Sequence, residues 1–326
     1  MTAPGLEGLL QKAVTRREPL WEEGRTTAVR LVNDAADGLA GVTVDRFAQV
    51  AVVSLYRTFE PAEEERLVEA VARLPGVASV YLKRRPREAR VVATTQKESL
   101  APEAPAAGPA VDSLVAHENG LAFDIRPGQG LSVGLYLDMR ETRAWVRREA
   151  KGRTLLNLFS YTCGFGVAAL AGGAMRAVNV DASRRVLDWG EANVRLNGGT
   201  PERRDFLSGD AFDWLSRFGK KGETFDVVVM DPPSFATTRT SRFSAARDYP
   251  KLAEAGARVV APKGLLVACC NLAQLPESRF EEQVLAGVAS AGRRARLLER
   301  LGPSPVDFPA EGGVVPGLKV RVLALE

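Results

Sequence analysis

The stretch from Leu155 to Ser183 constrains the fold of this chain more than any other. A short apolar run is followed by a turn containing Gly164 and Gly166, then by a helix of small residues, then by a second apolar run that ends on Asp181. This order predicts a strand, a tight turn, a helix and a second strand with a carboxylate at its end. Because strands joined by a helix lie parallel, the stretch predicts an α/β fold.

The same unit has the features of an adenosine site. A turn of small residues at a helix N-terminus lets a ligand approach the backbone, and Asp181 is placed to accept hydrogen bonds from a ribose diol. Asp181 follows Asn157 by 24 positions, close to the roughly 20-residue spacing of nucleotide sites. The glycines do not spell GxGxxG, which disfavours a dinucleotide. S-adenosylmethionine, which carries adenosine without a pyrophosphate, is the leading candidate; the alternative is an Asp that ends a strand for solubility alone.

The composition restricts the class of protein. With 326 residues, the chain is long enough for two domains, since roughly 100–200 residues make one. Hydrophobic residues make up 45% and charged residues 26%, as in an ordinary globular protein. The excess of 44 Lys and Arg over 40 Asp and Glu permits a nucleic-acid partner but is too small to demonstrate one.

Cysteine and histidine usage indicates the compartment. Three cysteines, two of them adjacent at Cys269 and Cys270, cannot form a disulfide framework, so we expect a reducing compartment. We find no segment that resembles a signal peptide and no apolar run of about 18 residues that could span a membrane. We therefore expect a cytoplasmic protein without a membrane segment. Because His117 is the single histidine, we also expect no metal site.

The first 126 residues alternate short strands and helices, which predicts a small α+β domain. A helix should open at Pro61, because proline suits a first helical turn. The Ala/Pro-rich segment 101–110 is typical of a loop. After it we expect a hairpin that returns to the sheet. The expected strands cover residues 27–32, 42–47, 50–56, 78–82 and 91–94, and those of the hairpin cover 114–117 and 121–125.

Residues 127–326 alternate strand and helix patterns. This alternation predicts an open, largely parallel, doubly wound sheet of the Rossmann-like type, which binds ligands at the carboxyl ends of its strands. A strand end should deliver Asp138 and Arg140 to the start of a helix. Asp210 follows the third strand and could accept from an adenine amino group or cap the next helix. The expected strands cover residues 155–159, 177–181, 205–208, 225–231, 264–269, 295–301 and 318–325.

The sharpest chemical motif is Asp231-Pro232-Pro233-Ser234-Phe235, directly after a buried strand. Two prolines fix the backbone and remove two donors, so that nearby carbonyls are left to accept from another group. With Asp231 and Ser234 beside it, the turn could hold a planar, amino-bearing group, and Phe235 offers a stacking face. A nucleobase would be gripped in this way for methyl transfer. The alternative is a plain rigid loop.

Several motifs together resemble one known family. They are Asp37-Gly38-Leu39, Asp45-Arg46-Phe47, Gly134 with Leu137-Asp138 and Arg140, Asn157 to Thr162, Val180-Asp181 with Ser183, Arg195 to Gly198, and the Asp231–Phe235 turn. Over nearly its whole length the chain resembles bacterial large-subunit ribosomal RNA methyltransferases of the RlmI/RlmK type. These are class I enzymes that use S-adenosylmethionine. The resemblance implies a class I methyltransferase domain over 127–326 and an accessory, RNA-binding α+β domain over 1–126.

The resemblance also implies roles for individual residues. Asp138 and Arg140 would lie near the methionine end of S-adenosylmethionine. The turn from Asp231 through Pro232, Pro233 and Ser234 to Phe235 would face the target base. The residues expected to line the rest of the cofactor pocket are Phe159, Ser160, Thr162, Gly164, Asp181, Ser183 and Asp210.

Two departures from the family pattern affect the expected chemistry. Cytosine-C5 members often begin with a small PUA domain, which we do not expect here. They also carry a nucleophilic cysteine after the fifth strand, at a position that aligns with Asn271. Cytosine C5 needs a thiolate at C6 before it attacks, whereas guanine N7 carries a lone pair and needs only positioning. Asn at this position is similar to the guanine-N7 members.

The sequence therefore predicts an S-adenosylmethionine-dependent methyltransferase acting on a base of 23S ribosomal RNA, with guanine N7 or N2 favoured and Asn271 in the base pocket. One alternative is a cytosine-C5 enzyme that uses Cys269 or Cys270. Others are a small-molecule methyltransferase on the same scaffold and a non-catalytic RNA-binding protein that keeps the cofactor pocket. Monomer and homodimer both remain open.

Two basic segments are candidates for RNA phosphate contact. One is the run from Lys83 to Arg90, and the other holds Arg239, Arg242 and Arg247 after the Asp231–Phe235 turn. The alternatives are a solvated hairpin face for the first segment and the ordering of a lid for the second.

Overall fold

The computed structural model describes residues 5–21, 24–85, 97–237, 242–310 and 317–326. The chain forms two compact units. The first comprises Met1–Leu137 with Ser304–Val314, and the second comprises Asp138–Pro303 with Val315–Glu326. Late in the chain, the backbone therefore leaves the second unit, adds one segment to the first, and returns. No sequence pattern predicted this return.

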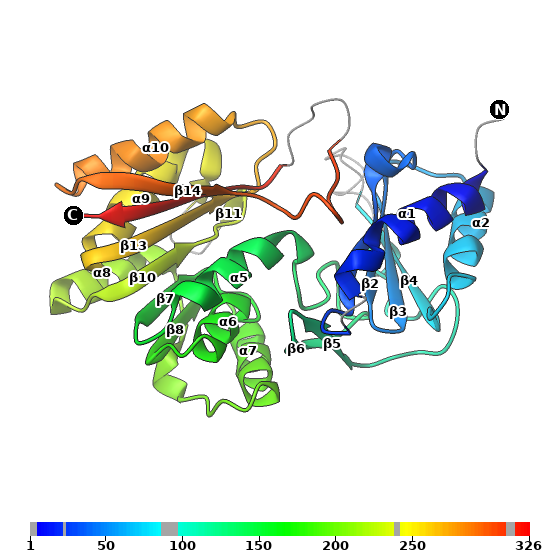
Figure 1. Ribbon diagram of the computed structural model, residues 1–326, viewed down its shortest axis with the longest axis horizontal. Coiled ribbons are helices and arrows are strands. Elements are labelled where there is room, and N and C mark those ends of the chain that lie inside the picture. Colours follow the sequence, from blue (N-terminus) through cyan, green and yellow to red (C-terminus); the bar gives the residue numbers. More distant parts are fainter. Residues whose placement is uncertain (1–4, 22–23, 86–96, 238–241, 311–316) are drawn as a thin grey trace. The chain divides into compact units, whose positions relative to one another are not determined.

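The first unit is built on a four-stranded sheet among its described residues, in the order β1-β2-β3-β4. Neighbouring pairs β1–β2 and β2–β3 are antiparallel, whereas β3 and β4 are parallel. Helix α2 connects the two parallel strands, and α1 and α2 pack their apolar residues on the sheet (Figure 1). The bounds are α1 Leu6–Trp21, β1 Ala28–Asn33, η1 Asp34–Asp37, β2 Val42–Phe47, β3 Val50–Leu55, α2 Pro61–Ala72, β4 Ser79–Arg84 and α4 Lys97–Leu100. The strand expected over 91–94 lies outside the described residues.

The hairpin of the first unit differs from its prediction. Strands β5 (Leu114–Glu118) and β6 (Leu121–Ile125) pair with each other in a separate two-stranded sheet and do not join the four-stranded one. The hairpin is attached just before β1, where the Thr27 N–H donates to the His117 carbonyl at 2.8 Å. The prediction that it returns to the sheet was wrong, because this attachment uses residues beside β1 and not the edge of a strand.

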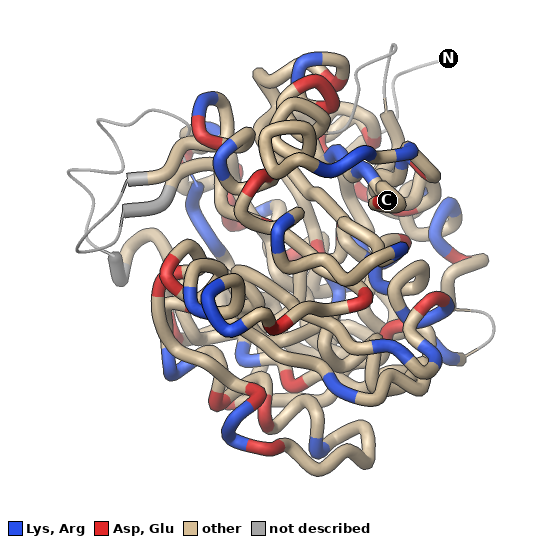
Figure 2. The backbone as a smooth tube through the Cα atoms, turned by 90° about the vertical axis from the view of Figure 1, so that its left-hand side faces the viewer, with Lys and Arg blue, Asp and Glu red and all other residues tan. Residues whose placement is uncertain are grey.

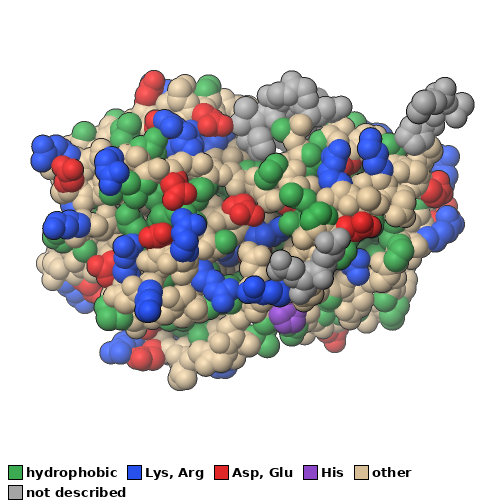
Figure 3. Space-filling model, viewed as in Figure 1, with side chains coloured by type: hydrophobic (Ala, Val, Ile, Leu, Met, Phe, Trp, Pro, Cys, Tyr) green, Lys and Arg blue, Asp and Glu red, His purple; other side chains and the backbone are tan. Residues whose placement is uncertain are grey.

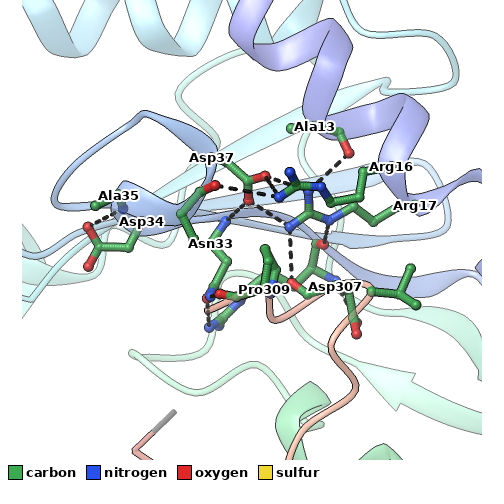
Figure 4. Close-up of polar contacts among 12 residues, drawn as sticks. Ala13, Arg16, Arg17, Asn33, Asp34, Ala35, Asp37, Asp307 and Pro309 are labelled. Carbon is green, nitrogen blue, oxygen red and sulfur yellow. Dashed lines mark hydrogen bonds and ion pairs between the residues drawn. The ribbon is translucent and has the colours of Figure 1, made fainter. Parts of the chain in front are cut away.

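A buried arginine holds the returning segment on the first unit (Figure 4). Arg17 is fully buried and donates to both carboxylate oxygens of Asp37, at 2.8 and 2.6 Å. The same guanidinium donates to the Asp307 carbonyl at 3.1 Å, and the Asn33 amide donates to the Pro309 carbonyl at 3.0 Å. Asp37 belongs to one of the motifs that resemble the family, and its carboxylate forms a structural ion pair with Arg17.

The second unit holds a seven-stranded sheet among its described residues, in the order β14-β15-β13-β10-β7-β8-β9. Strands β13, β10, β7, β8 and β9 run parallel; at one side β15 pairs antiparallel with β13, and β14 pairs antiparallel with β15. This architecture confirms the predicted Rossmann-like sheet. The strands are β7 Thr154–Leu158, β8 Arg176–Asp181, β9 Phe206–Ser208, β10 Phe225–Met230, β13 Val260–Cys270, β14 Ala295–Leu301 and β15 Lys319–Leu325.

Helices cover both faces of this sheet (Figure 1). Successive side chains of a strand point to opposite faces, so Leu156 and Leu158 pack beneath α8, α9 and α10, while Leu155 packs beneath α5 and α6. The helices are α5 Arg140–Glu149, α6 Gly164–Ala171, α7 Arg184–Leu196, α8 Ala211–Lys221, α9 Ala245–Arg258 and α10 Glu277–Ser290, with the short η3 at Arg203–Asp205.

Two local features of the second unit differ from the prediction. Asp138 and Arg140 are delivered to α5 by the single helical turn η2 (Leu137–Met139) and not by a strand end. The segment after Asp231–Ser234 forms an antiparallel ribbon of β11 (Phe235–Thr237) and β12 (Arg242–Ser244). Three-residue strands carry too little alternation to be recognised in a sequence.

Candidate functional site

The predicted site residues of the second unit follow strands that end at the same edge of the sheet. Leu158 at the end of β7 is paired with Val180 of β8 and with Met230 of β10, and Met230 is paired with Ala268 of β13. The turn after β7, the acid at the end of β8, the turn after β10 and Asn271 after β13 therefore share the carboxyl edge. This is where an open α/β sheet binds its ligands.

The turn after β7 has an unusual backbone. Phe159, Tyr161 and Cys163 have φ values of 58°, 48° and 62°, in the left-handed region that costs a non-glycine residue roughly 1–2 kcal/mol. The turn is held by the Ser160 N–H, which donates to the Val180 carbonyl at 2.9 Å, and by the Cys163 N–H, which donates to the Ser160 carbonyl at 2.8 Å. Strained backbone of this kind persists only where its surroundings hold it, and it gathers at ligand sites.

Asp181 links two of the turns. One carboxylate oxygen accepts the Tyr161 N–H at 2.9 Å, and the other accepts the Ser183 N–H at 2.9 Å. Loss of solvation raises the pKa of Asp181, and these two donors oppose the rise. A carboxylate offers about four acceptor positions, so two donors leave capacity for a ribose diol. The residues present therefore fit the adenosine of S-adenosylmethionine.

Helix α7 supports the same turn through two residues. Asn193 is fully buried and its amide donates to the Thr162 carbonyl at 3.0 Å. At Gly190, a Cβ atom would lie 2.2 Å from the Cys163 sulfur, so only glycine lets the helix approach this closely. Sequence reasoning missed Asn193. The available signal was a polar residue on the same helix face as Leu187, Gly190 and Val194, where burial demands a partner.

Asp210 follows β9 and caps the next helix. Its carboxylate accepts the Phe212 N–H at 2.8 Å, as the capping alternative required. Gly209 immediately before it donates its N–H to the Asp181 carbonyl at 3.0 Å, which fixes the distance between the two acids along the edge. Ser183 stands at the N-cap position of α7, where its side chain makes no capping hydrogen bond.

A second group gathers where β10 and β13 end. The Asn271 amide lies 3.4 Å from a carboxylate oxygen of Asp138, which places the start of α5 beside the end of β13. Loss of solvation and, to a smaller extent, the charge of the neighbouring Asp138 raise the pKa of Asp231, Arg143 opposes them, and the pKa is about 7. Arg143 was not among the predicted site residues. Arg143 is buried on α5. In the sequence it stands four positions before another basic residue, Arg147, a spacing that is common among exposed arginines on a helix surface.

The cysteines beside this group are buried. Cys163, Cys269 and Cys270 are all free thiols without exposed surface. Loss of solvation raises the pKa of all three, and the charge of Asp231 raises the pKa of Cys269 further. The thiolate is the nucleophilic form of cysteine. The structure therefore disfavours attack by Cys269 or Cys270 on a base.

Tyr249 connects the two strand ends behind the site. Its hydroxyl donates to the Cys269 carbonyl at 2.8 Å and lies 3.4 Å from the Met230 carbonyl. These carbonyls come directly before Cys270-Asn271 and Asp231. Tyr249 is fully buried on α9 and packs edge-on against Phe280 at 4.8 Å between ring centroids. Sequence reasoning missed it, because nothing in a helix pattern reports where a hydroxyl will lie.

Tyr249→Phe should destabilise the second unit and loosen the spacing of Asp231 and Asn271. Removing one partner of a buried hydrogen bond costs about 1–3 kcal/mol, so the denaturation midpoint in urea should fall. We also expect a methyl-transfer rate reduced by about tenfold, a barrier change of roughly 1.4 kcal/mol. A variant with unchanged stability and unchanged rate would show that the hydroxyl has no part in spacing the two strand ends.

A family model described as S-adenosylmethionine-dependent methyltransferase matches residues 33–323. The chain belongs to this family. It is a methyltransferase enzyme with S-adenosylmethionine as its cofactor. The match extends across both units, and the strained turn and the acids Asp181 and Asp210 lie within it.

This methyltransferase is similar to curated relatives over most of its length. It is 33% identical over 324 residues to ribosomal RNA large subunit methyltransferase I of Aeromonas salmonicida, covering 96% of this chain and 79% of the relative. It is 35% identical over 297 residues to the ribosomal RNA large subunit methyltransferase of Deinococcus radiodurans, covering 91% and 72%. Among solved structures, a protein assigned as a methyltransferase was crystallised in complex with SAH. Its sequence is 29% identical to this chain, the TM-score is 0.86, and the match covers 98% of this chain and 80% of that protein.

The structure corrects the prediction that Lys83, the first residue of the basic run from Lys83 to Arg90, contacts RNA phosphates. Lys83 is fully buried and donates to the Pro102 carbonyl at 3.4 Å, and loss of solvation and Arg85 lower its pKa to about 8 while Glu103 opposes the shift. It does not present its charge to RNA, because its position on β4 points it into the unit. Residues 86–90 lie outside the described residues.

The second basic segment is only partly described. Arg239 and the side chain of Arg242 lie outside the described residues, and Arg247 is exposed but pairs with Asp248 at 3.0 Å. Basic and acidic positions are interspersed along the backbone (Figure 2). They are also interspersed on the face shown in Figure 3. Within the described part of the chain, no helix is long and apolar enough to cross a membrane.

Proposed function

We propose that this methyltransferase modifies a base of large-subunit ribosomal RNA, with guanine N7 or N2 as the acceptor atom. The relatives that cover most of the chain are named for ribosomal RNA of the large subunit. The observation that carries the choice of base is the position of Asn271 beside Asp138 and Asp231, with both neighbouring cysteines buried. Such a substrate would be met in the cytoplasm, which is also the compartment that the cysteine usage predicts.

The proposed cofactor contacts follow the carboxyl edge of the sheet. Asp181 would accept from the ribose, Asp210 from the adenine amino group, and Asp138 and Arg140 would lie toward the methionine end. The remaining lining residues would be Phe159, Ser160, Thr162, Gly164 and Ser183. When bound, S-adenosylmethionine supplies the methyl group.

The proposed base contacts lie at the ends of β10 and β13. The Asp231 carboxylate would accept a hydrogen bond from an amino or imino group of guanine, and Pro232 and Pro233 would hold that carboxylate in place. Ser234 and the Asn271 amide would add polar contacts, and the exposed ring of Phe235 would stack on a base. Guanine would attack through its own nitrogen: N7 through its free lone pair, or N2 with loss of one amino proton to the Asp231 carboxylate, so holding the base in line with the methyl group would account for most of the catalysis.

The proposed role of the first unit is accessory. Residues 1–126 would contact RNA outside the target base, while 127–326 carry the methyl transfer. Basic and acidic side chains are interspersed on the face drawn in Figure 3, so the proposal rests on the domain order and on the relatives. Mass spectrometry of ribosomal RNA nucleosides from wild-type and deletion strains tests the function: one methylated guanine should disappear in the deletion strain.

The variant Cys269→Ala/Cys270→Ala should retain methyl transfer within about tenfold, a barrier change of roughly 1.4 kcal/mol. Both thiols are buried with raised pKa, which supports the expectation that neither supplies the thiolate that cytosine-C5 chemistry needs. Asn271→Ala should reduce the rate by more, because it removes a polar group from the base pocket. The rates are measured with tritiated S-adenosylmethionine on RNA from the deletion strain.

A trapping experiment separates the two chemistries directly. RNA that contains 5-fluorocytosine captures the covalent intermediate of a cytosine-C5 enzyme, and we expect no adduct on a denaturing gel. An adduct that disappears with Cys269→Ala or Cys270→Ala would overturn the guanine assignment and identify the nucleophile.

A further inference from the structure

The ribbon of β11 and β12 begins where the proposed base-contacting turn ends. Phe235 is paired with Ser244, and Ala236 with Phe243. The Ser234 carbonyl accepts the Ala245 N–H at 3.0 Å, which closes the base of the ribbon against the start of α9. The ribbon is therefore joined directly to the turn that carries Asp231.

The two faces of the ribbon have opposite character. Side chains directly opposite each other in an antiparallel pair share a face, and neighbours along a strand lie on opposite faces. Phe243 thus lies on one face of the ribbon, and Phe235 lies on the other. Phe243 is 7% exposed and Phe235 is 70% exposed. One aromatic ring anchors the ribbon and the other is presented to solvent.

The buried ring packs on residues of the cofactor site. The centroid of the Phe243 ring lies 6.4 Å from that of Phe159 and 6.3 Å from that of Phe212. Phe159 belongs to the strained turn after β7, and the Phe212 N–H donates to Asp210 at 2.8 Å. Both partners of Phe243 therefore lie on the segments that we propose to hold adenosine.

We propose that Phe243 is a positioning residue that couples occupancy of the cofactor site to RNA binding by Phe235. A ligand held between Asp181 and Asp210 restricts the motion of Phe159 and Phe212, and so of the ring that rests on them. The restriction of Phe243 also restricts the ribbon and the Phe235 ring on its outer face. The protein therefore loses less conformational entropy when RNA binds after the cofactor. By linkage, RNA tightens the cofactor by the same factor. This inference rests on the proposed function.

Calorimetry tests the coupling. The Kd of S-adenosylhomocysteine is measured alone and with a saturating in vitro transcript of large-subunit ribosomal RNA. The wild-type enzyme should bind it at least about fivefold more tightly with RNA, the lower end of typical coupling. The coupling ratio is the Kd without RNA divided by the Kd with RNA. In Phe243→Ala this ratio should fall to about one. Phe243→Leu, which keeps an apolar side chain in the buried position, should lose most of the ratio while its affinity without RNA stays within about threefold of wild type.

Two further variants complete the test. Phe235→Ala should lose the coupling although Phe243 is intact, whereas Met175→Ala should keep it. Met175 is matched to Phe235 in exposure, at 69%, but stands at the other edge of the sheet, before β8. Coupling preserved in Phe243→Ala, or a wild-type enzyme that methylates this RNA with a ratio of one, would overturn the inference and leave the proposed function standing. A wild-type enzyme that methylates no ribosomal RNA would overturn both.

Discussion

Asp231→Asn should lower the methyl-transfer rate by about 100-fold, the scale expected when a reacting group is displaced or its proton acceptor is lost. The variant should also be more stable than wild type at pH 8, because it removes a carboxylate that is charged there in a poorly solvated position. Loss of activity with a gain of stability marks a residue kept for function. The two measurements are single-turnover kinetics and the Tm at pH 8.

The pH dependence of both quantities has a definite sign. Folding raises the pKa of Asp231 to about 7, so the folded state binds this proton more tightly than the unfolded chain does. The stabilising contribution of Asp231 is therefore present below about pH 4 and lost as the pH rises through about 7. We propose that activity needs the carboxylate, and on that proposal the rate should rise over the same range in which this stability is lost. Asp231→Asn should abolish that rise.

A second variant checks the cause of the shift. Asp138 contributes to the raised pKa of Asp231, so Asp138→Asn should move the midpoint of the rate profile to lower pH. A rate profile that is flat between about pH 6 and pH 8 in the wild-type enzyme, under conditions where chemistry limits the rate, would remove Asp231 from the acceptor role.

Asp181→Ala should weaken S-adenosylhomocysteine binding by about 10- to 100-fold, since hydrogen bonds to a charged acceptor contribute roughly 1.5–3 kcal/mol. The loss has two sources. The ribose loses its acceptor, and the Tyr161 and Ser183 N–H groups lose theirs, which releases the strained turn after β7. Calorimetry gives the affinity directly.

Asp226→Ala is the matched control for this variant. Asp226 also links two strands with its carboxylate, which accepts the Thr154 N–H and hydroxyl at 2.8 Å each. It stands near the amino end of β10, whereas Asp181 stands at the carboxyl end of β8. Asp226→Ala should lower the Tm and leave the cofactor affinity close to wild type. Equal affinity in Asp181→Ala and wild type would exclude Asp181 from the ribose site.

Local patterns predicted much of the fold. Within the strand Phe225–Met230, residues Val227 to Met230 form a continuous apolar run because they are buried on both faces, and that is visible without any partner. The turn residues after β7 and β10 are likewise local, since glycine widens and proline narrows the choice of backbone conformations wherever they stand. The hairpin at 114–125 was predicted correctly because its strands and turn are also local patterns. Its separation from the four-stranded sheet was not predicted, because a strand joins a sheet only if it meets backbone groups that are distant in the chain.

The sequence by itself determined the alternation of strands and helices, the order in which they occur, and the acids that end or follow β8, β9 and β10. These features depend on residues close together in the chain. Only the tertiary structure decided that Asp138 lies near Asp231 and Asn271, and that Tyr249 joins the ends of two strands. It also decided that Lys83 is buried and that the segment 304–310 is held by Arg17. Each of those contacts joins residues far apart in the chain. Its hydrogen bonds, desolvation and charge arise only once folding has brought the two partners together.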